Sequence, residues 1–164
     1  MRIFSFFISL LLCASLVSCS RGGDEDAETI LRAIMKEQSD LPAGVIYTDG
    51  AQEGDEGYMS PALTRALWGE DAEEGFAMLS DYAVYMSSFA APYEIGVFIC
   101  YSSTDARRVE ELCRARADII SVALRQTEFY SLCGNLRIVR RGRTVVFLMT
   151  SDPDGAVRLA KGLI

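Results

Sequence analysis

Residues 81–101, with the sequence DYAVYMSSFAAPYEIGVFICY, decide the fold of this chain. The segments 81–89 and 94–101 alternate in the two-residue period of β-strands, and the four residues between them include Pro92, so together they predict a β-hairpin. Immediately downstream, residues 104–126 predict a long amphipathic helix whose apolar stripe is formed by Val109, Leu112, Cys113, Ala117, Ile120 and Leu124. A second hairpin is predicted over 135–140 and 143–150, around Arg141 and Gly142.

Shorter elements surround this centre. A helix is expected over 24–38, a short strand at 45–47, a helix that Ser60 caps with Pro61 in its first turn, another helical turn or two over 71–79, and a final helix from Asp152 to Leu163. Consecutive hairpins make an antiparallel sheet, and the long helix must bury its stripe. We therefore expect an α+β domain in two layers: an antiparallel sheet of about four to five strands, packed on one face by the long amphipathic helix and the shorter helices.

The N-terminal segment predicts export and lipidation. Arg2 precedes an apolar run, and Leu16, Val17, Ser18 and Cys19 form a lipobox, the site at which a secreted precursor is lipidated on cysteine and cleaved before it. The run 3–17 is shorter than the ~20 residues of a membrane-spanning helix. We expect a signal peptide over 1–18, the lipidated Cys19 with a tether over 19–26, and one domain over 27–164. The expected location is the extracytoplasmic face of the cell membrane, held by at least two acyl chains.

Composition narrows the chemistry. The chain carries a net charge of −7 and no histidine, which excludes Ser-His-Asp and Cys-His catalytic groups and histidine-ligated zinc. An exported acidic protein is not expected to bind nucleic acid. Cys100, Cys113 and Cys133 are odd in number and lack metal-site spacing, so buried free thiols are favoured over one disulfide plus one thiol. No metal site and no cofactor are expected, and the acidic loop 49–56 lacks the spacing of a calcium-binding hand.

Residues 82–152 carry a resemblance. The segments DYAVYMSSFAAPYEIGVF (81–98) and RRGRTVVFLMTSD (140–152), the charged helix between them and the lipobox resemble a family of lipoproteins from Clostridia-like Gram-positive bacteria, known only as a domain of unknown function. Gly96 stands where that family usually has alanine. The resemblance implies a membrane-anchored extracytoplasmic domain and supplies no activity or catalytic residues.

Three features are candidate sites. Arg137, Arg140, Arg141 and Arg143 cluster around the second hairpin turn and could contact anions such as phospholipid headgroups, wall-polymer phosphates or an acidic protein patch; the alternative is a solvated strand edge. Glu94, at a strand start, could be a functional carboxylate or could cap a turn. The aromatic residues Tyr82, Tyr85, Phe89 and Phe98 predict the inner face of the sheet rather than a ligand groove.

No catalytic constellation is recognisable. The leading hypothesis is a non-enzymatic, lipid-anchored binding or accessory module with an envelope protein as its partner. The alternatives are an envelope enzyme that works through carboxylates, with Glu94 the first to test, and a small solute-binding lipoprotein, for which ~146 mature residues are few.

Overall fold

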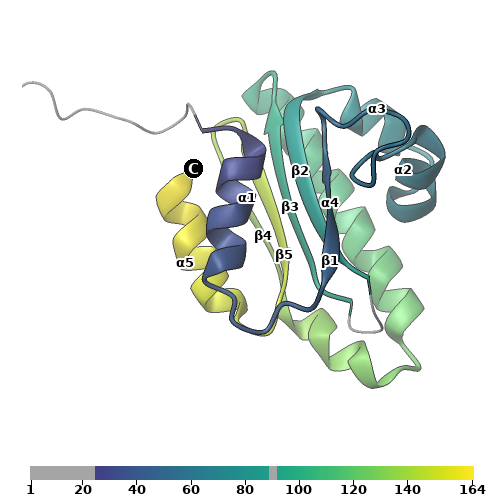
Figure 1. Cartoon of the computed structure of the whole chain (residues 1–164), viewed down its shortest axis with the longest axis vertical. Helices are drawn as coiled ribbons and strands as arrows, with labels where there is room; N and C mark the ends of the chain where they lie inside the picture. The colour runs from purple at the N-terminus through teal and green to yellow at the C-terminus, as the bar shows by residue number, and fades with distance from the viewer. Residues whose placement is uncertain (1–24, 89–91) are drawn as a thin grey trace, which may run out of the picture.

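The computed structural model describes residues 25–88 and 92–164. Its elements, in chain order, are α1 (Ala27–Lys36), β1 (Gly44–Thr48), α2 (Pro61–Trp68), α3 (Ala72–Phe76), β2 (Leu79–Ser87), β3 (Glu94–Cys100), α4 (Ser103–Leu124), the 3-10 helix η1 (Glu128–Asn135), β4 (Leu136–Arg141), β5 (Thr144–Met149) and α5 (Pro153–Leu163) (Figure 1). The predicted α+β class is confirmed, and each predicted helix and strand is present within a few residues.

The strands form one five-stranded antiparallel sheet in the order β1-β2-β3-β5-β4. Both predicted hairpins are present, as β2–β3 and β4–β5. β3 pairs with β5, with Val97 opposite Val146, and joins the two hairpins at the centre of the sheet. β1 adds the outer strand beside β2.

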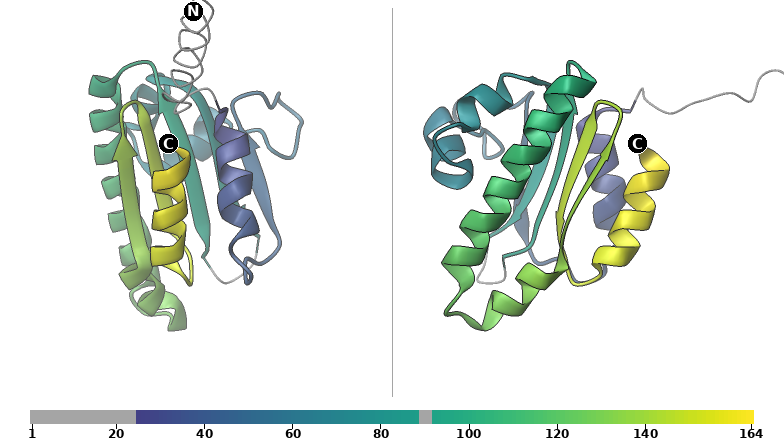
Figure 2. Two further views of the ribbon diagram at one scale, coloured as in Figure 1. Left: turned by 90° about the vertical axis from the view of Figure 1, so that its left-hand side faces the viewer. Right: turned by 180° about the vertical axis from the view of Figure 1, so that it is seen from behind.

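Helices cover both faces of the sheet, so the predicted two-layer arrangement is wrong. α4, with α2 and α3, covers one face, whereas α1 and α5 cover the other (Figure 2). The strand composition explains the third layer, because β5 (TVVFLM) is apolar at almost every position and is buried on both sides. A strand that alternates apolar and polar residues needs one cover; a continuous apolar strand needs two.

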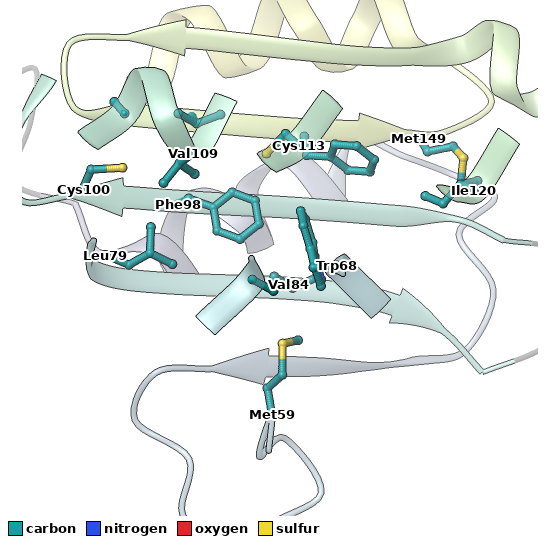
Figure 3. Packing of buried hydrophobic residues seen from close by; sticks show 14 residues of the cluster. Met59, Trp68, Leu79, Val84, Phe98, Cys100, Val109, Cys113, Ile120 and Met149 are labelled. Carbon is teal, nitrogen blue, oxygen red and sulfur yellow. The ribbon is translucent and has the colours of Figure 1, made fainter. Parts of the chain in front are cut away.

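The aromatic residues of the strands are divided between these two layers. Tyr82 and Phe98 pack on the α4 side, whereas Tyr85 packs on the side of α1 and α5. The prediction of one shared inner face is therefore wrong for Tyr85, and Phe89 lies outside the described residues. On the α4 side, Trp68 meets the ring of Phe98 edge-on, with 5.3 Å between ring centroids (Figure 3).

Local hydrogen bonds fix where the helices begin. The Ser60 hydroxyl accepts a hydrogen bond from the Leu63 N–H (3.2 Å), as the capping pattern predicts, and the Asp152 carboxylate does the same for Gly155 (2.9 Å). At the end of α2, Gly69 adopts a φ of +93°, a backbone region that favours glycine. After this turn the chain continues into α3, and both α2 and α3 contact α4.

Candidate functional site: an acidic groove beside the long helix

The described part of the chain contains a groove of about 500 Å³ between α4 and the α2–α3 corner. We call it the acidic groove; it is lined by Trp68, Gly69, Glu70, Asp71, Glu74, Gly75, Met78, Arg108, Glu111, Leu112, Ala115, Asp118 and Ile119. Trp68 and Gly75 are buried and Leu112 and Met78 half-buried, so the floor is apolar. The groove is therefore a surface hollow with an apolar base, the type of place where ligands bind.

The rim of the groove is strongly negative. Five exposed carboxylates belong to it (Glu70, Asp71, Glu74, Glu111 and Asp118), against a single guanidinium, that of Arg108. Arg108 already lies 3.5 Å from Glu74. Among residues 25–88 and 92–164, the other four carboxylates form no ion pair and no side-chain hydrogen bond.

The order of charges along α4 leaves the groove carboxylates unpaired. On the outer face of this helix the sequence offers three opposite-charge pairs four residues apart, of which the structure forms Glu110–Arg114, at 2.6 Å. In that pair the acidic residue comes first, which is the favourable orientation on a helix. Because Arg114 pairs with Glu110, it does not pair with Asp118, whose carboxylate lines the groove without an ion-pair partner in the described residues.

A buried ion pair lies behind the groove wall. Arg116 donates to both carboxylate oxygens of Glu94, from Nη2 at 2.7 Å and from Nε at 3.2 Å, and its Nη1 donates to the Leu67 carbonyl at 2.6 Å. The guanidinium also stands 5.7 Å from the centre of the Trp68 ring. These contacts join β3, α4 and the end of α2, and so hold the wall that carries Trp68.

Glu94, the predicted functional carboxylate, is thus a partner in an ion pair. Glu94 is 2% exposed and both its oxygens are engaged by Arg116. A general base must reach the proton it removes, and this carboxylate faces protein on all sides. Sequence reasoning missed Arg116; the available signal was a charged residue at an apolar-stripe position, three residues after Cys113 and four before Ile120.

The predicted arginine cluster is divided between the two faces of the sheet. Arg140 contacts Glu110 of α4 (2.6 Å), whereas Arg141 donates to the main-chain oxygens of Lys161 and Ile164 at the end of α5. Arg137 binds the carbonyls of its neighbours and lies 3.9 Å from Asp154. Arg143 is exposed beyond the turn. An anion contact by these residues stays a prediction, but three of the four already bind groups within the chain.

Cys100, Cys113 and Cys133, the cysteines of the described residues, are free; Cys100 and Cys113 are buried, as favoured from the sequence, whereas Cys133 is half-buried. Burial raises the pKa of the Cys100 thiol to about 11 and holds the pKa of Cys113 well above its usual value. Both are poor nucleophiles for that reason. Within the described ranges no group of three histidine, cysteine or acidic side chains could hold a metal ion.

The lipobox residues Leu16, Val17, Ser18 and Cys19 lie outside the described residues, so lipidation stays a prediction. In the part of the chain that the structure describes, no helix is long and apolar enough to cross a membrane. The first described helix, α1, begins at Ala27, where the predicted tether ends.

The acidic groove was not predicted from the sequence. Its signal is the segment WGEDAEEG (68–75), in which the only tryptophan of the chain is followed by four acidic residues within six positions. The sequence predicts only the end of one helix and a further helical turn or two from Asp71 in this segment, since the surface of α4 that completes the groove lies some 40 residues later. No protein-family model, no curated protein and no solved structure matches the chain.

Proposed function

We propose that this protein is a lipid-anchored, extracytoplasmic binding module that captures a partner of the cell envelope in the acidic groove. The groove itself is the observation that carries the proposal: an apolar floor below four exposed carboxylates that have no ion-pair partner in the described chain. Unpaired charges of one sign around a hollow repel one another in the free protein. A ligand of opposite charge relieves this repulsion, so such a hollow favours a cationic ligand.

Two further features support a binding role over catalysis. The carboxylate first considered for catalysis, Glu94, is held by Arg116 away from solvent. The groove carboxylates, by contrast, are exposed to solvent around the hollow. Exposed carboxylates around a hollow are suited to electrostatic recognition of a cationic partner.

The anchor is tested with the full-length protein expressed in a lipoprotein-processing bacterium. Wild type is expected in the membrane fraction, with acyl chains on the N-terminal cysteine detected by mass spectrometry. Cys19→Ala should move the protein out of that fraction. Unchanged membrane association of Cys19→Ala, without acylation of the wild type, would contradict the anchor.

The binding site is tested by photocrosslinking in those membranes. A photoreactive amino acid replaces Ala115, which lines the groove, or Ala123, an exposed alanine on the same helix outside the groove. A defined adduct from position 115 that is absent from position 123, and that disappears with Glu111→Lys/Asp118→Lys, supports the proposal. Equal labelling from both positions, or adducts that ignore the charge reversal, count against the groove as the binding site.

A further inference from the structure

The shape of the acidic groove limits what it can hold. On α4 its lining runs from Arg108 to Ile119, which at 1.5 Å per residue is about 16 Å. The opposite wall follows α4 over the same length: Gly69 lies against Ile119, with 3.8 Å between a β-carbon built on Gly69 and the Ile119 Cδ1, while Gly75 lies against Leu112. The groove is therefore elongated, and about five residues of an extended chain would match its length.

The negative charge is spread along this length. Glu111 and Asp118 are seven residues apart on α4, about 10 Å along the helix axis. On the opposite wall, Glu74 lies near the Arg108 end, and Glu70 and Asp71 follow Gly69 at the Ile119 end. A ligand that satisfies both ends needs at least two cationic groups about 10 Å apart.

The surface between the charged ends is apolar. Ile119 is 37% exposed, and it lies with Leu112 and Ala115 on the groove side of α4. The ligand must therefore present aliphatic groups between its charges. Lysine-rich or arginine-rich segments with interspersed aliphatic residues have this pattern, and their long side chains can lie along an apolar surface while the charged ends reach carboxylates.

Trp68 lies beneath this apolar surface. It is 1% exposed, and its indole N–H is buried and has no partner in the described residues, so the N–H is not a contact for a groove ligand. The exposed part of the floor is aliphatic and includes Ile119. A peptide can cover it with branched aliphatic side chains between its charges, whereas a linear polyamine offers only methylene groups.

We infer that the ligand of the acidic groove is a short, extended segment of a basic polypeptide, in which lysine or arginine residues flank aliphatic ones. The inference rests on the proposed binding function and specifies its ligand. Affinity comes mainly from the apolar floor, because exposed ion pairs contribute little each. The carboxylates select a cationic partner and speed its association, which makes binding sensitive to salt.

The chain contains its own reporter for this ligand. Trp68 is its only tryptophan and lines the groove, so its fluorescence should respond to occupancy. The full-length lipidated protein, in neutral detergent micelles, is titrated with a hexapeptide of alternating lysine and leucine. A glutamate–leucine hexapeptide is the charge-reversed control, and spermidine is the polyamine control.

We expect saturable quenching or a wavelength shift with the basic peptide, weakened roughly tenfold or more by Glu111→Lys/Asp118→Lys. The matched control, Glu53→Lys/Glu56→Lys, changes the net charge equally on exposed residues of another loop and should bind as wild type does. Raising the salt concentration should weaken binding to wild type. These results together would support the inference.

Three results would overturn the inference. One is the absence of a Trp68 response to the basic peptide; another is equal loss of binding in both double variants, which would indicate net charge rather than the groove. The third is spermidine binding as tightly as the peptide, which would assign the groove to a polyamine. The crosslinking experiment in membranes distinguishes this inference from the proposed function. If the groove-dependent crosslink forms but any of these three results is obtained, the basic peptide is rejected as the ligand and the binding function stands. If no groove-dependent crosslink forms, the proposed binding function itself is rejected.

Discussion

Replacement of Arg116 by methionine, which removes the guanidinium, should destabilise the domain more than the same replacement of an exposed arginine on α4. In Arg116→Met the Glu94 carboxylate stays buried, with a side chain 3% exposed, but loses all the side-chain hydrogen bonds that it accepts from Arg116. The Leu67 carbonyl at the end of α2 loses its donor as well. The buried charge is then uncompensated, and the groove wall loses the contact that ties α2 to α4.

The magnitude follows from the burial of both partners. Breaking a buried ion pair by removing one partner costs about 3–5 kcal/mol, whereas an exposed pair contributes about 0–1 kcal/mol. For a domain of this size the larger figure corresponds to a decrease in Tm of roughly 10–20 °C. Replacing both partners, in Glu94→Met/Arg116→Met, removes the unpaired charge and should recover most of the loss.

The assay is urea unfolding followed by Trp68 fluorescence and circular dichroism, with the change in unfolding free energy taken from the midpoint. Arg114→Met is the matched control, because Arg114 lies two residues away on α4 in an ion pair with Glu110 and is 62% exposed. Our reasoning is refuted if Arg116→Met costs no more than Arg114→Met. It is also refuted if the double variant is less stable than the single one.

Three other outcomes follow from the packing. At pH 8 an alkylating agent should modify Cys133, which is half-buried, well before Cys113, whose pKa burial holds well above its usual value; equal rates measured by mass spectrometry would contradict this. Gly96→Ala places a β-carbon 2.7 Å from the ring of Phe98 and should cost about 1–3 kcal/mol of unfolding free energy, so an unchanged urea midpoint would contradict the packing. Burial raises the pKa of Tyr82 to about 12, so the unfolded chain loses this proton first as the pH rises above 10; stability should fall between about pH 10 and 12 in wild type, and less so in Tyr82→Phe.

Much of the fold followed from local signals. The period-two segments around Tyr85 and Val97 gave both strands of the first hairpin, and Ser60 and Asp152 marked the first residues of α2 and α5. These features depend on neighbours within a few positions, so an isolated sequence specifies them. The 3-10 helix η1 was missed because its segment, EFYSLCGN, has neither a helical nor a strand period.

The candidate site followed much less from the sequence. Nothing in the sequence distinguishes Glu111 and Asp118 from the other charged residues of α4. Glu70 and Asp71 likewise resemble the acidic residues of any exposed turn. Glu94 was singled out, but its role depends on Arg116, 22 residues later and on another element. A pairing over that distance depends on how the helix lies on the sheet, and local pattern carries no information about it.

The sequence by itself therefore determined every helix and strand except η1, the antiparallel hairpins and the α+β class, because each depends on residues near one another in the chain; the lipid anchor at Cys19 stays a prediction from the sequence. The tertiary structure decided that helices cover both faces of the sheet, that the hairpin arginines separate, that Arg116 binds Glu94, and that two acidic segments some 40 residues apart border one groove. These are consequences of packing: burying β5 on both faces requires two helical layers, and α2, α3 and α4 pack together in one of them, where the unpaired carboxylates meet.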